Sequence, residues 1–188
     1  MPEPPQAFAE GLVALHAVLD SPVRPGLELR LVPAPKRMAP WSVAVAAEVL
    51  RDDEDVASGR FIVLHDPQGQ DGWRGDTRVV AFVEAAVDAD MGNDPALADV
   101  GWSWLTESLA QRHAAHTAAG GTVTRTTSKR FGQLEEQDET CQVEVRASWT
   151  AVPGPSGLDL GQHLQAWCDL LCSTAGLPPV GVTALRPA

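Results

Sequence analysis

The chain has 188 residues, 44% of them hydrophobic, which suits one domain with a sizeable core. Its formal net charge is −11 with 14 lysines and arginines, which disfavours general binding to a nucleic-acid backbone. No apolar run approaches the about 20 residues of a membrane span, and the N-terminus lacks the features of a signal peptide. We therefore expect a single acidic, cytoplasmic domain over residues 1–188, with no nucleic-acid and no membrane partner.

The first half of the chain is predicted to hold one helix and three strands. Apolar residues at helical spacing predict the helix over residues 6–19, and prolines follow it. Residues 21–41 form a Pro-rich connecting segment, in which Leu27, Leu29 and Leu31 alternate with charged residues. This alternation leaves open whether part of the segment is a short edge strand. β-rich runs separated by turn residues predict strands over 43–50, 59–64 and 77–87.

The second half is predicted to hold two helices and two strands. Helical spacing of apolar residues predicts helices over 98–115 and 159–175. Between them lie a polar strand, 122–131, and a strand of strict apolar and polar alternation, 140–151. The expected fold is α+β, a largely antiparallel five-stranded sheet with three helices on one face, in the order α-β-β-β-α-β-β-α.

His65 and Asp66 lie where a predicted strand enters a turn. A histidine beside a carboxylate is a candidate base or metal ligand, and we count both residues among the candidate ligand- or partner-binding residues. The alternative is that Asp66 starts the turn with Pro67 and that His65 is an ordinary strand-end residue, which the surrounding turn residues favour.

A basic group stands out in this acidic chain. Arg125, Lys129 and Arg130 lie in one predicted strand, and Arg146 lies on the polar side of the next. A hairpin that brings them together would form a patch for a phosphate, a carboxylate or an acidic peptide. The alternative is an edge strand that charged side chains protect from aggregation.

Two tryptophans, Trp41 and Trp73, lie in Pro- and Gly-rich loops. Loop aromatics act as interface anchors or fold over a core as lids, and both interpretations stay open.

The cysteines and the known sequence motifs point to no particular chemistry. Cys168 and Cys172 are four residues apart within an apolar helical stripe, which favours core packing over a metal or redox site. The sequence contains no dinucleotide-binding, phosphate-loop or serine-hydrolase motif. We therefore predict no cofactor, no metal and no catalytic residue, and consider an enzyme less favoured than a binding protein.

Several runs together carry a resemblance to a known family: residues 59–67 (GRFIVLHDP), 100–105 (VGWSWL), 121–125 (GTVTR), 146–150 (RASWT) and 166–172 (AWCDLLC). With them the chain resembles, over nearly its whole length, an uncharacterised actinobacterial family, domain of unknown function 3000. This resemblance implies no activity and no catalytic residues. Separately, the element order is similar to that of type III secretion chaperones and related small α+β proteins, which are acidic, often dimeric and bind other polypeptides without catalysis.

Two hypotheses about function follow. The first is a non-enzymatic, chaperone-like module that meets a protein partner, or a second copy in a homodimer, through an open sheet face or through residues 21–41. The second is an anionic small-molecule-binding protein or enzyme that uses the basic patch around Arg125 and Arg146. A deep pocket where His65, Asp66 and Arg125 converge would count against the first hypothesis.

Overall fold

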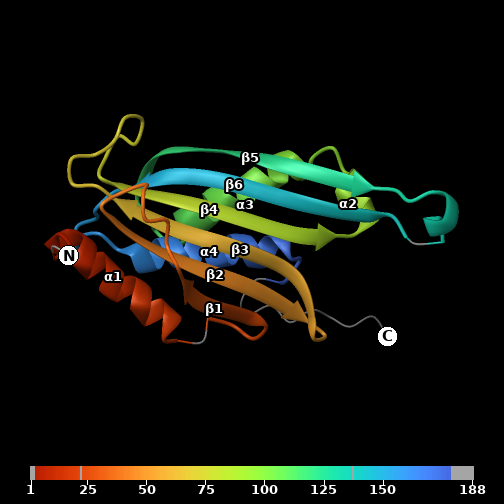
Figure 1. Ribbon diagram of the computed structural model, residues 1–188, viewed down its shortest axis with the longest axis horizontal. Coiled ribbons are helices and arrows are strands. Elements are labelled where there is room, and N and C mark those ends of the chain that lie inside the picture. The colour runs from red at the N-terminus through yellow and green to blue at the C-terminus, as the bar shows by residue number, and fades with distance from the viewer. Residues whose placement is uncertain (1–2, 22, 137, 179–188) are drawn as a thin grey trace.

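Alternating apolar residues give each long strand one side that must be buried, and the strands bury it together in a single antiparallel sheet (Figure 1). The computed structural model describes residues 3–21, 23–136 and 138–178. The strands lie in the spatial order β1-β2-β3-β4-β6-β5. They are β1 (Leu27–Val32), β2 (Trp41–Arg51), β3 (Glu54–His65), β4 (Thr77–Val87), β5 (His116–Ser128) and β6 (Thr140–Ala151).

Helices cover one face of this sheet, which we call the covered face, and no helix of the described residues lies on the other, the open face (Figure 1). They are α1 (Gln6–Leu19), the short α2 (Ala89–Asn93), α3 (Leu97–Gln111) and α4 (Leu160–Thr174). Helix α4 lies between α1 and α3 and packs on β3, β4 and β6. The Asp159 carboxylate caps its N-terminus by accepting the Gln162 N–H at 3.1 Å. A one-turn 3₁₀ helix, η1 (Gly132–Leu134), lies in the β5–β6 hairpin.

The core lies between the covered face and α4. Phe61, Trp149 and Trp167 are fully buried there, together with the leucines of α4. The Trp167 ring lies 5.7 Å from that of Phe61, and its indole N–H donates to the Phe82 carbonyl at 3.2 Å. The central helix is therefore tied both to side chains and to the backbone of the sheet.

The predicted α+β class and antiparallel sheet are confirmed, whereas the predicted five strands and three helices are wrong. The described residues form six strands and four α-helices. Residues 27–32 of the Pro-rich segment are the sixth strand, an edge strand that pairs with β2 between the flanking prolines. The unpredicted helix is α2, which Asp88 caps by accepting the Met91 N–H at 2.8 Å.

The predicted bounds agree for residues 6–19 and 77–87 and differ most around β5. Strand β5 begins at His116 rather than at residue 122, and the Gly120–Gly121 pair, which is typical of a turn, lies inside it. Gly120 and Gly121 instead follow a bulge inside the strand, and a Cβ at Gly121 would overlap the Arg146 carbonyl oxygen. Within the described residues, none of the helices has the length and apolar character needed to cross a membrane.

Candidate functional site

Side chains on the open face form transverse rows, because the antiparallel register places one residue of each strand side by side. From β1 to β5, the acidic row is Glu28, Glu48, Ser58, Glu84, Glu144 and Thr124. The adjacent arginine row is Arg30, Ala46, Arg60, Phe82, Arg146 and Thr122. The apolar row beyond it is Val32, Ala44, Ile62, Val80, Ser148 and Gly120.

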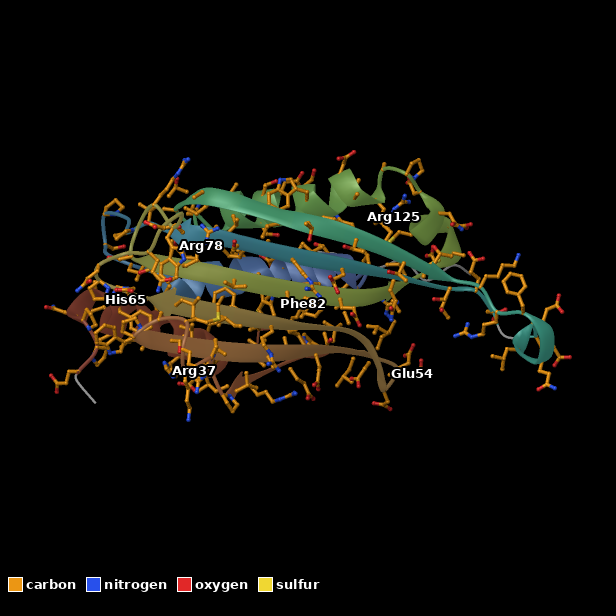
Figure 2. The ribbon with its side chains drawn as sticks, turned by 45° about the horizontal axis from the view of Figure 1, so that its top comes forward. Arg37, Glu54, His65, Arg78, Phe82 and Arg125 are labelled. Atoms are coloured by element: carbon orange, nitrogen blue, oxygen red, sulfur yellow. The ribbon has the colours of Figure 1, made fainter. Side chains whose placement is uncertain are left out.

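Phe82 stands in the middle of this face, on the central part of β4 (Figure 2). It is half-buried, and the Arg146 guanidinium lies 5.5 Å from its ring centroid. A hollow of about 390 Å³ lies on its β3 side, above Ala46 and Gly59. Another of about 610 Å³ lies on its β6 side, next to Gly120. Each hollow contains residues with little or no side chain beside the large Phe82 ring, and an arginine, Arg60 or Arg146, borders it.

The charges of the open face are only partly paired. Glu28 lies directly opposite Glu48 in the register, and this arrangement of like charges is destabilising by itself. Arg30 relieves it through a 2.8 Å ion pair with Glu48, and this contact lowers the pKa of that carboxyl group. Arg60 forms no ion pair with any described residue.

The same pattern recurs on the other side of Phe82. Glu84 lies directly opposite Glu144, and Arg146 pairs with Glu144 at 2.6 Å. Glu84 and Glu28 have no cationic partner among the described residues. The open face therefore carries like charges side by side, and packing within the chain does not require this arrangement.

A wall closes one end of the open face, formed by the loops 33–40 and 66–76. The Gln70 side chain donates to the Met38 carbonyl at 2.9 Å and joins the two loops. On β6, Thr150 lies one row beyond Ser148 of the apolar row, and its hydroxyl donates to the Trp73 carbonyl. The opposite end of the sheet carries the β2–β3 turn and the projecting β5–β6 hairpin (Figure 1).

His65 lies on the covered face and not at an accessible strand end. Its ring stacks on Phe8 at 4.9 Å, with Trp41 tilted against it at 6.1 Å. Nδ1 lies 2.8 Å from the Thr77 hydroxyl, which donates to Asp76, so Nδ1–H is the donor to Thr77. Nε2 is buried without a hydrogen-bond partner among the described residues. Burial lowers the pKa of His65, and the ring is a neutral part of the core.

Asp66 and Trp73 belong to the wall. The Asp66 carboxylate accepts the Gln68 N–H at 3.1 Å, which is the turn arrangement that the sequence favoured. Trp73 is half-buried and held by its backbone carbonyl, and Trp41, also half-buried, begins β2 beside His65. Neither tryptophan lies next to Phe82.

The structure does not bring the predicted basic residues together. Arg125 is on the covered side, where its guanidinium donates to the carbonyls of Gly92 at 3.4 Å and Asp94 at 2.7 Å (Figure 2). Arg146 is on the open face, so the two arginines lie on opposite sides of the sheet. Arg125 stabilises the end of α2 rather than contributing to a patch.

Lys129 and Arg130 lie in a third place, the β5–β6 hairpin that projects beyond the body of the protein (Figure 1). The Lys129 ammonium lies 5.8 Å from the Phe131 ring centroid, and Arg130 donates to the Asp138 carbonyl at 2.7 Å. Of the predicted basic residues, only Arg146 therefore contributes to the open face.

Three residues of the open face, Arg60, Phe82 and Glu84, are not among the site residues predicted from the sequence. They occupy outward positions in β3 and β4, which read as apolar central strands because their inward residues dominate. Period-two alternation through Arg60 and Glu84 is the signal that indicates a solvent-facing side.

The chain matches a protein-family model over most of its length. Residues 4–183 match the model described as a protein of unknown function (DUF3000). The chain belongs to the DUF3000 family. The match confirms the resemblance carried by the five sequence runs, and it spans both the open face and the helices of this DUF3000 protein. No curated protein and no solved structure matches, so the likeness to secretion chaperones in element order stays a prediction.

Proposed function

We propose that this protein binds a polypeptide on the open face of its sheet and catalyses no reaction there. The observation that carries the proposal is Phe82, an aromatic side chain set between two hollows on a sheet face that no described helix covers. Aromatic residues beside pockets, within a polar rim, are typical anchors of protein interfaces.

The dimensions of the site suit a polypeptide better than a small ligand. The two hollows lie on either side of β4, with centres about two strand spacings, or roughly 10 Å, apart. Both are shallow and open, and neither contains a histidine or a cysteine in its lining. A chain that places two apolar side chains in the hollows and polar groups against the charged rows would use the whole face.

The ionisable groups with raised or lowered pKa values lie mainly on the other side of the sheet. Burial lowers the pKa of His163 to about 4 and raises the pKa of the Cys168 thiol. Both side chains belong to α4 and pack in the core, away from the open face. Their shifts follow from enclosure, which supports a structural rather than a catalytic role.

The test is photo-crosslinking followed by a binding measurement. In cells that produce this protein, a benzophenone amino acid replaces Phe82. The cells are irradiated, and any polypeptide crosslinked at that position is identified by mass spectrometry. That polypeptide is then purified and titrated against wild type, Phe82→Ala and Phe131→Ala. We expect Phe82→Ala to weaken binding about tenfold or more. Phe131, which is 71% exposed on the hairpin, is the matched control and should not affect binding. Equal binding by all three proteins would contradict the proposal.

A second candidate is an anionic small ligand in a cleft of about 540 Å³ between α3 and α4. Arg24 lines this cleft and donates to the Pro178 carbonyl at 3.0 Å, while its Nε is buried without an acceptor among the described residues. Arg112 lies nearby in a two-point ion pair with Asp169, at 2.6 and 2.9 Å. This cleft suits the anionic-ligand hypothesis better than Arg125 and Arg146, which lie on opposite faces.

Thermal-shift measurements with a panel of phosphate and carboxylate compounds test the second candidate. A ligand that stabilises wild type and Arg125→Gln but not Arg24→Gln would support it. No shift with any compound of the panel would reject it.

A further inference from the structure

The polypeptide that the open face is built to take, we infer, is a second copy of this chain. The two sheets would pack face to face about a two-fold axis that runs across the strands, between the acidic row and the arginine row. This inference rests on the proposed function, because it names the occupant of the same face.

The order of the charges provides the first argument. On β6, Glu144 and Arg146 occupy the acidic and arginine rows, and on β1, Glu28 and Arg30 do the same. A two-fold axis between the rows exchanges them, so Arg30 and Arg146 of one copy face Glu28 and Glu144 of the other, whereas Arg60 faces Ser58. A partner with charge of one sign would match only one row, whereas a second copy matches both rows at the two strands β1 and β6.

The net charge of the chain points to the same occupant. Two copies that each carry −11 repel one another over most of their surfaces. The acidic and arginine rows, with the apolar row beside them, hold four glutamates and three arginines, which leaves this face almost neutral. Association through it therefore brings together the parts of the two chains that repel least.

The wall selects the position of the axis. It rises beyond the apolar row, at one end of the face only. An axis close to the wall would drive the two walls into each other's sheets. An axis between the acidic and arginine rows places each wall beyond the β2–β3 turn of the other copy. The two Phe82 rings then lie on either side of the axis, about one row spacing of 7 Å apart, within the usual range of aromatic pairs.

The available area is sufficient. Five strand spacings of about 4.8 Å and four rows of about 6.8 Å give roughly 650 Å² per copy. These are the three rows defined above and the next one towards the β2–β3 turn, which contains Ala86, Gln142 and Thr126. Stable interfaces bury about 600 to 1,000 Å² on each partner. The axis also keeps the strands of the two sheets nearly aligned, as in other sheet-on-sheet packings.

Sedimentation velocity on the purified full chain, with a charge-exchange pair, tests the inference. Wild type is expected at twice the monomer mass of 20.0 kDa. Arg146→Glu alone places glutamate against glutamate, and Glu144→Arg alone places arginine against arginine, so each variant should be monomeric. Both variants also lose the ion pair between Arg146 and Glu144 within one chain, so each variant serves as the control for that loss in the other. Their equimolar mixture restores both contacts across the axis and should form a one-to-one heterodimer.

Each other outcome overturns the inference. A monomeric wild type shows that the face does not take a second copy. A dimer that survives both substitutions uses another surface, and a mixture that stays monomeric places the axis elsewhere. If wild type is monomeric while a different purified polypeptide binds through Phe82, the proposed function stands and only this inference fails. If no polypeptide crosslinks at Phe82 either, both fail.

Discussion

The two faces of the sheet are made by the same strands, yet their side chains differ in burial and in packing. On the covered face, β4 carries Val79, Ala81 and Val83, all fully buried under α4. On the open face, the same strand carries Arg78, Val80 and Phe82, which are only half-buried. Packing accounts for nearly every residue of the covered face. It does not account for glutamates side by side, an isolated phenylalanine and two hollows on the open face.

This difference separates residues that stabilise the fold from residues that are available for binding. A covered-face residue should affect the free energy of unfolding strongly and association little, and an open-face residue should do the reverse. Three measurements test that separation, beginning with the largest effect.

Trp167→Ala should destabilise the protein by about 3–5 kcal/mol, because it removes a fully buried ring between Phe61 and the backbone of β4. Phe82→Ala, on the opposite side of that backbone, should cost about 1 kcal/mol or less in the monomer. Urea unfolding followed by circular dichroism at low protein concentration measures both. Equal costs would mean that the open face belongs to the core.

Acidification should destabilise the protein through His163. The buried Trp149 N–H donates to its Nδ1 at 3.0 Å, and burial lowers the pKa of the folded-state ring to about 4. In the unfolded chain the pKa returns to about 6.5. Unfolding therefore takes up a proton below that pH, and stability falls by about 3 kcal/mol as the pH drops from 6.5 towards 4. The lowered pKa of His65 acts in the same direction.

The control for this pH dependence is His163→Asn, in which the amide oxygen can still accept the Trp149 N–H. Urea midpoints measured at intervals between pH 7.5 and 4.5 should converge for the two proteins as the pH falls. Parallel curves would show that folding does not lower the pKa of His163 and would contradict its enclosure.

The smallest effect is expected for Arg125→Ala, at the residue that the sequence placed in a binding patch. Its loss removes hydrogen bonds to the end of α2 at an exposed position and should cost about 0.5 kcal/mol. Association through the open face should be unchanged, because Arg125 lies on the other side of the sheet. A loss of dimer or polypeptide binding with Arg125→Ala would show that the two faces do not act separately.

The parts of the fold that were predicted correctly are those with a strong local signal. The helix over residues 6–19 and the strand over 77–87 have uninterrupted periodicity between clear breakers. The sequence does not decide strand β1, because the prolines around it also fit a connecting segment and its pairing with β2 is a contact that no local pattern reveals. The start of β5 was missed because Gly120 and Gly121 read as a turn when in fact they permit close approach of β6.

The candidate site was harder to predict, because it depends on register. Arg60, Phe82 and Arg146 come from three separate strands and become neighbours only when β3, β4 and β6 are aligned. The basic group was chosen by closeness in sequence, which takes no account of the side of the strand on which each residue lies. Arg125 and Arg146 therefore seemed close, although the pleat sends them to opposite faces.

Gly59 lies between a hollow of the open face and the core. A Cβ at this position would lie 2.6 Å from the Phe82 carbonyl oxygen and 2.8 Å from the Trp167 ring. Gly59 also lines the hollow on the β3 side of Phe82. At this point only a single layer of backbone separates the hollow from a buried indole. The fluorescence of Trp167 should therefore respond to an occupant of the hollow, and comparison of wild type with Trp167→Phe separates its emission from that of the other five tryptophans without attaching a dye.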